Sequence, residues 1–444
     1  MKTYILKTLF YTALIIFCLV ADYANATRVE ITISKKIDRK TRVTLLPFFA
    51  KTSDSTDILL ARELFSVLSF DLRHAGYFEL WPEEKLPESV LERGIQYQAM
   101  DFDFWLDYAT EIVIKGSYNI SGSSVTIEMY CYDMATRSTL FARTVSGERS
   151  ELRYLAHKIS GAFIESLSGG RPSITTSKIS YVVRKGVNSE IYVMDYDGQN
   201  PKQVTFENSL AINPEWLHDS SGFLYVSYRN GYPLLYLKNL TSSNIKLVSG
   251  KPGLNVHPAV SPDGKKIALT MSFNGNPEIY IIDLNGEILQ RVTYDPAVDS
   301  SPTWAPDSRR LAFVSDRSGT PQIYVADYLA DTVKRVTYRG TYNTSPSWNP
   351  IANSPLIVYT SMYGKNTELY LVDINTGDTR RLTTTLESEE DPSWAPDGIH
   401  ISYTLTQNYR SFIYFMDVRD CIPICLTETE TDSRASSWGP AYYK

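Results

Sequence analysis

The fold is decided by Ser301-Pro302-Thr303-Trp304-Ala305-Pro306-Asp307-Ser308, a stretch that occurs in related form six times in the second half of the chain. Its tryptophan position recurs with spacings of 44, 44, 44, 46 and 44 residues, at Trp216, Val260, Trp304, Trp348, Trp394 and Trp438. Two further series keep this spacing: Asp195, Asn239, Asp283, Asp327, Asp373, Asp417, and Thr205, Ser249, Thr293, Thr337, Thr383, Thr427. A repeat of this length is typical of a β-propeller.

Each repeat predicts four short strands. Prolines on both sides of the tryptophan limit the hydrogen bonding of the first strand, and Pro-Asp-Gly after it favours a turn. Runs such as Lys266–Met271 and Ile279–Asp283 supply the second and third strands, and the fourth ends near Thr293. The tryptophans are expected to pack between neighbouring blades, because an aromatic ring there buries a large apolar area. The aspartates of the Pro-Asp-Gly motif are expected to form turns, and those of the Asp195 series, each at the end of a strand, are expected to be structural.

The two ends of the repeat region predict how the ring closes. After Trp438 only six residues remain, so the last repeat consists of a first strand alone. The other three strands of a blade precede the first tryptophan, at Lys178–Val183, Glu190–Asp195 and Lys202–Thr205. We therefore expect a six-bladed β-propeller over 178–444, closed by pairing of the C-terminal strand with the strands near 178–206. Such closure leaves no free sheet edge between the first and last blades.

Residues 27–170 lack the repeat and predict a small N-terminal α/β domain. Apolar residues at helical spacing indicate helices over 57–75 and 151–167. Runs at 42–48, 111–118, 124–132 and 138–145 predict strands. Residues 171–177 are the expected linker to the ring.

Residues 1–26 predict a secretory signal peptide with cleavage after Ala26. Lys2 and Lys7 precede an apolar run from Leu9 to Val20, and Ala24-Asn25-Ala26 provides small residues at the cleavage site. The alternative is a membrane anchor, but the apolar run is shorter than the roughly 20 residues that a span needs. Removing the peptide leaves 42 basic and 49 acidic residues, a net charge of −7. The mature chain is expected to be exported and soluble, and its sequence has no dense patch of Lys and Arg. We therefore do not expect nucleic acid or anionic lipid to be its main partner.

The remaining sequence offers little support for catalysis, a metal or a cofactor. No two of the five histidines stand at i, i+4, and neither a nucleophile elbow nor a phosphate-binding loop is present. Cys131 is expected to pack in the small domain. An extended chain would separate Cys421 from Cys425 by roughly 13 Å at ~3.3 Å per residue. A disulfide between them therefore requires a tight turn at 422–424.

The residues just before each short first strand are expected at the mouth of the propeller channel. They are Asn213, Leu254, His257, Ser300, Ser301, Thr344, Ser345, Glu390 and Asp391. Neutral polar and acidic groups favour a protein or peptide ligand, or a cation, over a phosphate.

The order of signal peptide, small domain and six-bladed ring resembles the TolB family of the Tol–Pal system. The similarity spans essentially all of the mature chain. The most specific stretches are 28–33, directly after the cleavage site, Arg42-Val43-Thr44-Leu45-Leu46-Pro47-Phe48, and Tyr154-Leu155-Ala156-His157-Lys158-Ile159 with the linker and strand that follow. Three positions depart from the family pattern: Arg171-Pro172-Ser173 in the linker, His218 in place of the motif proline, and Ile351 in place of the turn aspartate.

The resemblance implies a non-enzymatic periplasmic protein that lies peripheral to the envelope membranes as a monomer. Such proteins bind the peptidoglycan-associated lipoprotein Pal at the propeller mouth and the inner-membrane protein TolA through a free N-terminal segment, here within 27–34. They support outer-membrane integrity and envelope constriction during cell division, and serve protein import. On this sequence the mouth residues named above become candidates for Pal contact. The candidates for TolA contact are Arg28, Val29, Glu30, Ile31, Thr32 and Ile33.

Two other classes of function stay open on the sequence. A propeller peptidase would need a further catalytic domain, which the chain is not expected to carry. A hydrolase or lyase with its site in the channel would need converging histidines and carboxylates, and Glu390 with Asp391 do not provide them. A receptor for cell-wall glycan would need exposed aromatic platforms, which 31 tyrosines allow. Recovery of a lipoprotein rather than glycan from an envelope extract would separate the two binding functions.

Overall fold

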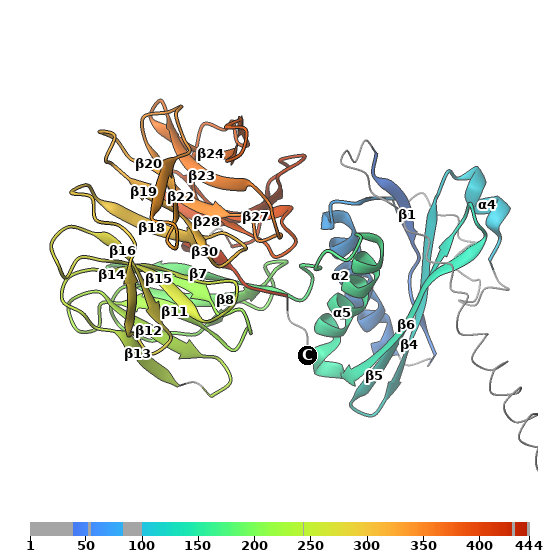
Figure 1. The fold of residues 1–444 in the computed structure, drawn as a ribbon. Coiled ribbons are helices and arrows are strands. Elements are labelled where there is room, and N and C mark those ends of the chain that lie inside the picture. Colours follow the sequence, from blue (N-terminus) through green and yellow to red (C-terminus); the bar gives the residue numbers. More distant parts are fainter. Residues whose placement is uncertain (1–38, 52–54, 83–99, 243, 429–430, 442–444) are drawn as a thin grey trace, which may run out of the picture.

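The computed structural model describes residues 39–51, 55–82, 100–242, 244–428 and 431–441. The predicted signal peptide and the N-terminal segment 27–34 lie outside these residues. Within the described residues, none of the helices combines the length and the apolar character needed to cross a bilayer. Two parts lie side by side: a helix-and-sheet domain and a β-propeller (Figure 1).

The N-terminal domain is built on a mixed sheet of strand order β3-β1-β4-β5-β6, with β2 beside β4. β1 pairs in parallel with β3 and β4, whereas β4, β5 and β6 form an antiparallel meander. The strands are β1 (Thr41–Leu45), β2 (Phe49–Ala50), β3 (Phe78–Leu80), β4 (Ile112–Ser121), β5 (Ser124–Asp133) and β6 (Ser138–Glu148). The helices are α2 (Ser55–His74), α4 (Phe102–Asp107), the 3₁₀ turn η3 (Arg149–Glu151) and α5 (Leu152–Leu167).

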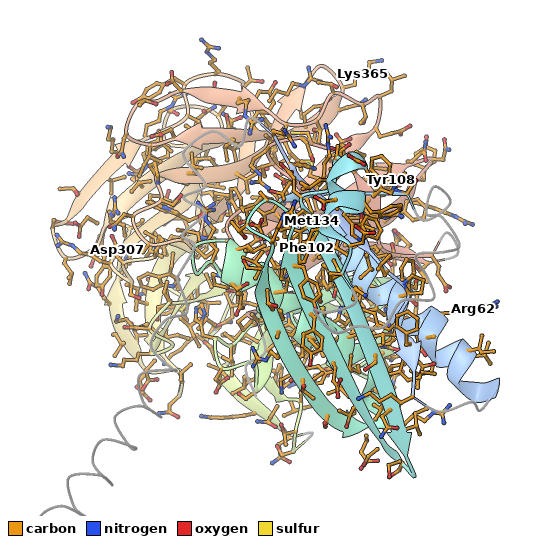
Figure 2. The ribbon with its side chains drawn as sticks, turned by 90° about the vertical axis from the view of Figure 1, so that its right-hand side faces the viewer. Arg62, Phe102, Tyr108, Met134, Asp307 and Lys365 are labelled. Atoms are coloured by element: carbon orange, nitrogen blue, oxygen red, sulfur yellow. The ribbon has the colours of Figure 1, made fainter. Side chains whose placement is uncertain are left out.

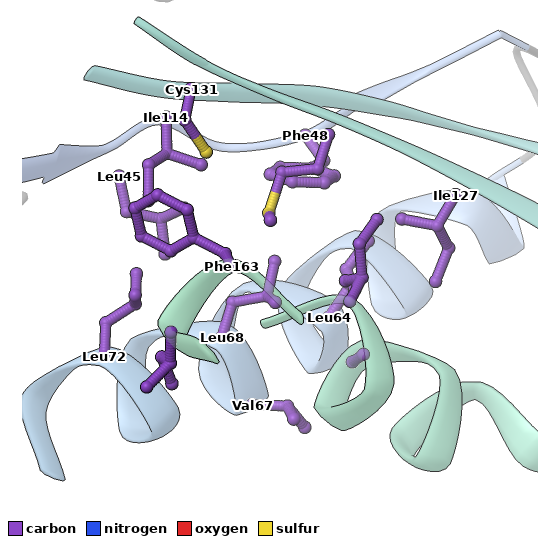
Figure 3. Close-up of a cluster of buried hydrophobic side chains, with 14 of the residues drawn as sticks. Leu45, Phe48, Leu64, Val67, Leu68, Leu72, Ile114, Ile127, Cys131 and Phe163 are labelled. Atoms are coloured by element: carbon purple, nitrogen blue, oxygen red, sulfur yellow. The ribbon is translucent and has the colours of Figure 1, made fainter. Parts of the chain in front are cut away.

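One face of this sheet is covered by α2 and α5, which bury their apolar stripes against it. Figure 3 shows Leu64, Leu68 and Phe163 pointing from the helices toward Ile127 and Cys131 on the sheet. Cys131 is fully buried, as expected from the sequence. At one end of the sheet, Phe102 and Met134 lie close together (Figure 2), in a second apolar cluster around Trp105.

The propeller has six blades of four antiparallel strands, as predicted. Blades 1 and 2 consist of β10 (Ala211–Trp216), β11 (Gly222–Ser227), β12 (Leu234–Asn239), β13 (Ile245–Ser249), and of β14 (Asn255–Val260), β15 (Lys266–Met271), β16 (Glu278–Asp283), β17 (Ile288–Arg291). Blades 3 and 4 consist of β18 (Asp299–Trp304), β19 (Arg310–Ser315), β20 (Gln322–Asp327), β21 (Thr332–Arg335), and of β22 (Asn343–Trp348), β23 (Leu356–Tyr363), β24 (Asn366–Asp373), β25 (Thr379–Arg381). Blade 5 consists of β26 (Ser388–Trp394), β27 (His400–Gln407), β28 (Arg410–Asp417) and β29 (Ile424–Cys425).

Blade 6 joins the two ends of the propeller region, which confirms the predicted closure. Its strands are β30 (Asp432–Trp438), β7 (Lys178–Lys185), β8 (Asn188–Asp195) and β9 (Lys202–Gln203). β30 pairs antiparallel with β7 from Asp432 opposite Arg184 to Trp438 opposite Ile179. The five tryptophans of the repeat are all buried, as expected. The indoles of Trp216, Trp304 and Trp394 each donate to a backbone carbonyl of the preceding blade.

The two other periodic series also have structural roles. Asp283 accepts from the backbone N–H groups of Asn285 and Glu287 and so stabilises the turn between third and fourth strands. In blades 2, 3, 4 and 6 the threonine hydroxyl accepts from a third-strand N–H and donates to an acidic or amide side chain one residue before it. Thr293 accepts from Ile279 at 2.9 Å and donates to Glu278 at 2.5 Å. These threonines therefore tie the end of their blade to its own third strand, whereas Ser249 at this position in blade 1 donates to Asn255 of blade 2.

The N-terminal domain packs on one face of the propeller, here called the near face. Helices α2 and α5 lie between the sheet and the propeller (Figure 1). The near face carries the turns between first and second and between third and fourth strands. Ile399 joins the core of the N-terminal domain, and Phe70 of α2 contacts Tyr196 and Phe415. The opposite or far face carries the remaining loops of each blade, and none of the described residues of the N-terminal domain packs on it.

Cys421 and Cys425 do not form the disulfide that a tight turn at 422–424 would have allowed. Both cysteines are free. The Cys421 thiol contacts the carbonyl of Val418, and the Cys425 thiol contacts that of Thr427. Residue Cys425 pairs with Tyr414 in the ladder of blade 5, so the chain continues into a strand and keeps the two cysteines apart.

Candidate functional site: the propeller channel and its far face

Each inner strand carries the same irregularity where it lines the channel. The pairing with the second strand shifts register at one point in all six blades. The residue inside each shift has a left-handed backbone, with φ between 47° and 52°, and none of the six is a glycine. They are Asn213, His257, Ser301, Ser345, Asp391 and Ala435. Five of them precede a proline, which lacks the N–H that a regular strand would use, so a bulge forms there.

The six left-handed residues ring one end of a channel cavity of about 420 Å³. A non-glycine residue in this conformation costs roughly 1 kcal/mol or more, and such strain gathers at functional sites. The other end of the cavity, toward the near face, is lined by His218 and by the turn prolines Pro262, Pro306, Pro350, Pro396 and Pro440. The channel wall thus repeats the same strained backbone conformation once in every blade.

Polar groups in the ring are only partly satisfied. Ser345 donates to Asp391 at 2.8 Å, whereas His257 Nδ1 and Asn213 Oδ1 are buried without a hydrogen-bond partner within the described residues. Burial lowers the pKa of His257, and the carboxylate of Asp391 works in the opposite direction. A neutral imidazole and a free amide oxygen can both take hydrogen bonds from an incoming polar ligand.

Glu215 was not singled out from the sequence, yet it lines the channel. The other inner strands carry alanine, threonine or serine at the matching position. Its carboxyl group accepts from Val260 N–H at 3.2 Å and Ser437 Oγ at 3.2 Å, so it links blade 1 to blades 2 and 6. Burial raises its pKa to about 7, against the two hydrogen bonds. Because the Glu215 carboxyl group bonds to the blades on both sides, its role is best explained as structural: it connects neighbouring blades of the ring.

The sequence-predicted mouth residues divide into two groups. Asn213, His257, Ser301, Ser345 and Asp391 line the cavity. Leu254, Ser300, Thr344 and Glu390 lie nearer the far face and do not line it. Ser300, Thr344 and Glu390 each stand one residue before the left-handed position, paired with the second strand. Leu254 is partly buried against the apolar cluster that blades 1 and 2 share.

The loops of the far face expose large apolar side chains that sequence reasoning missed. Phe206, Tyr294 and Tyr338 follow the periodic threonine in blades 6, 2 and 3 and are 73%, 68% and 70% exposed. Further exposed residues are Val187, Leu210, Tyr232, Val298, Tyr342, Leu386 and Tyr409 in these loops, and Met362 at the far-face end of β23. Their position after the threonine could have identified the first three. Apolar side chains gathered on one face mark interaction sites, and tyrosine is favoured in protein interfaces.

Comparison with known protein families decides the ancestry of this architecture. Residues 164–442 match the family described as TolB beta propeller domain, and residues 29–140 match the TolB amino-terminal domain. The chain belongs to the TolB family. This confirms the resemblance found in the sequence and associates the chain with the Tol-Pal system.

Individual TolB proteins show how far the similarity extends. The crystal structure of TolB from Acinetobacter baumannii superposes with a TM-score of 0.79 at 26% identity, over 91% of this chain and 97% of that one. The Tol-Pal system protein TolB of Geobacter sulfurreducens is 37% identical over 160 residues, 36% of each chain. That of Pseudomonas putida is 27% identical over 232 residues, 51% of this chain and 52% of the relative. The chain thus spans between about a third and half of these curated relatives in the matched regions.

Proposed function

We propose that this protein is a non-enzymatic, periplasmic docking component of the Tol-Pal system that binds the lipoprotein Pal at the far face of its propeller. The observation that carries this proposal is the asymmetry of the ring. One face is occupied by the N-terminal domain, and the other exposes apolar side chains around a strained polar channel. Pal contact is assigned to Asn213, Leu254, His257, Ser300, Ser301, Thr344, Ser345, Glu390 and Asp391, with Tyr294 and Tyr338 at the periphery.

Introducing an arginine at the far-face mouth tests this assignment. Thr344→Arg is expected to weaken binding of the soluble Pal domain by about tenfold or more, or ~1.4 kcal/mol, because its bulk and charge would occupy the docking surface. Isothermal titration of the two purified proteins measures this. Leu329→Arg is the matched control, since Leu329 is 66% exposed in a near-face turn. Equal affinities for both variants and the wild type would contradict docking at this face.

We further propose that the signal peptide 1–26 directs export, and that 27–33 engages TolA by adding a strand to a sheet of that partner. Alternating side chains at Arg28–Ile33 suit this mode, in which backbone hydrogen bonds supply the affinity. The domain division at 171–177 belongs to the same proposal, with the N-terminal domain presenting the segment.

Deleting residues 27–33 separates the two binding sites. TolA binding is expected to disappear in a pull-down, because the pairing strand is gone. If the segment also docks on the body of the protein in competition with its release, Pal affinity will change as well, as reciprocal coupling requires. Unchanged Pal affinity would rule out coupling through this segment, and retained TolA binding would contradict the assignment of 27–33.

A receptor for cell-wall glycan is the competing candidate, favoured by the exposed tyrosines of the far face. The wild-type protein should capture a lipoprotein from an envelope extract. Capture of glycan without lipoprotein would favour the receptor instead, and turnover of any substrate would contradict the non-enzymatic assignment.

A further inference from the structure

A buried cluster of charged side chains joins the two domains. Asp71 of α2 accepts from His157 Nδ1 at 2.9 Å, from the Tyr196 hydroxyl at 2.5 Å, and from Ser160 of α5. Tyr196 belongs to the turn after β8, so this carboxylate of the N-terminal domain is held partly by the propeller. Asp71 and His157 are 1% and 3% exposed, and Tyr196 is fully buried.

The same histidine faces a second carboxylate from the propeller. His157 Nε2 lies 3.5 Å from Asp197 Oδ2, and Arg153 of α5 pairs with that carboxylate. The titratable groups that face His157 are thus Asp71 from α2, Arg153 from its own helix, and Tyr196 and Asp197 from the propeller. Two carboxylates and two cations balance only while His157 carries its proton. Burial works to lower the pKa of His157, but Asp71 and Asp197 outweigh burial and raise it to about 10.

The chain segment between the domains is fixed by the same cluster. Thr175 Oγ1 donates to the His157 carbonyl at 2.7 Å, and Trp438 of the closing strand donates to Ser177 Oγ at 2.8 Å. Ser173, Ile174, Thr175 and Ser177 are all buried. A Cβ on Gly161 would lie 2.4 Å from Thr175 Oγ1, so α5 and the linker are in close contact. The linker therefore does not behave as a free tether in this arrangement.

We propose that this cluster is a latch that fixes the angle between the two domains, with His157 held between Asp71 of one domain and Asp197 of the other. Contacts between domains of one chain resemble transient interfaces, and movement is the default unless something opposes it. A buried ion cluster adds little net stability compared with apolar packing, but it tolerates few alternative arrangements because each displaced charge would be left unpaired. The latch does not depend on which partners the protein binds.

Hydrogen exchange of the linker amides tests the latch. Asp71→Asn and Asp197→Asn are expected to speed exchange in 173–177 by about tenfold at pH 7, because each leaves a buried cation unbalanced and lets the joint open. Exchange in β4 and β5 should stay as in the wild type. Asp263→Asn, which removes an exposed carboxylate of the propeller paired with Lys266, is the matched control and should leave the linker unchanged.

The pH dependence provides a readout that a merely structural role would not give. Because the pKa of His157 is raised, its stabilisation of the closed joint is complete below pH about 6.5 and is lost as the pH rises toward about 10. After correction for intrinsic exchange, wild-type protection of 173–177 should fall by up to about tenfold per pH unit above pH 7. Both asparagine variants should show a flatter profile, since each removes a carboxylate that raises the pKa.

Two results would overturn the latch: linker exchange unchanged in both variants, or a wild-type profile without the decline. If Asp71→Asn also exposes β4 and β5, that variant has unfolded its own domain, and Asp197→Asn decides. Faster linker exchange in Asp197→Asn with β4 and β5 protected supports the latch, and unchanged linker exchange refutes it.

Discussion

Replacing Trp438 with alanine is expected to lower the free energy of unfolding by about 3–5 kcal/mol, the range for deleting a large buried aromatic side chain. Trp438 is 6% exposed and stands on the strand that closes the ring. Its indole packs edge-on against Phe415 at 5.9 Å and donates to Ser177 Oγ, while its backbone N–H donates to Ser393 Oγ at 3.0 Å. The substitution thus leaves a cavity at the seam of blades 5 and 6 and removes the indole donor from Ser177, whose hydroxyl keeps only its bond to the Ile174 carbonyl.

Urea unfolding followed by far-ultraviolet circular dichroism measures this loss. Leu386→Ala provides the control, because Leu386 is 91% exposed in a far-face loop and its truncation should change the free energy of unfolding by less than about 0.5 kcal/mol. A loss below about 1 kcal/mol for the tryptophan variant would show that ring closure does not rest on this side chain.

The fold was largely predictable because its information is local and repeated. The tryptophan spacing, the turn prolines and the helical apolar stripes each act within a few residues, so blade number, closure and α5 followed from the sequence. The strand predicted over 42–48 ends at Leu45, because the backbone beyond Leu46 leaves the ladder before Pro47. The short strands β2 and β3 were not predicted, since their parallel pairing with distant strands leaves no periodic signal.

The site was less predictable because it depends on backbone geometry and on the packing of the blades. The left-handed φ of His257 and Asp391 arises from a bulge. The sequence does not predict it, because the residue before a proline ordinarily prefers an extended conformation. Glu215 gains its role from neighbours in two other blades, 45 and 222 positions away. The latch likewise joins Asp71 to Tyr196 across 125 positions. No spacing in the sequence reports such contacts.

The second substitution with a large expected effect removes the buried acceptor of a periodic threonine. Glu278 is 1% exposed and accepts from Thr293 Oγ1 at 2.5 Å and from Arg291 at 2.8 Å. Glu278→Ala is expected to lower the free energy of unfolding by about 3 kcal/mol, because Arg291 and Thr293 lose their common acceptor in a buried site. This value is at the low end of the range for breaking a buried ion pair, because water can still reach Arg291, whose side chain is 27% exposed.

Blade 3 supplies the matched control for this substitution. Gln322 occupies the equivalent position, and its amide oxygen accepts from Thr337 at 2.9 Å, so a neutral acceptor suffices for the threonine contact. Glu278→Gln should therefore cost about 1 kcal/mol, the worth of replacing a charged acceptor with a neutral one. Equilibrium urea unfolding of both variants distinguishes the two causes. Equal losses for alanine and glutamine would mean that the negative charge matters, whereas a small loss for glutamine would show that the hydrogen bond to the threonine holds the blade together.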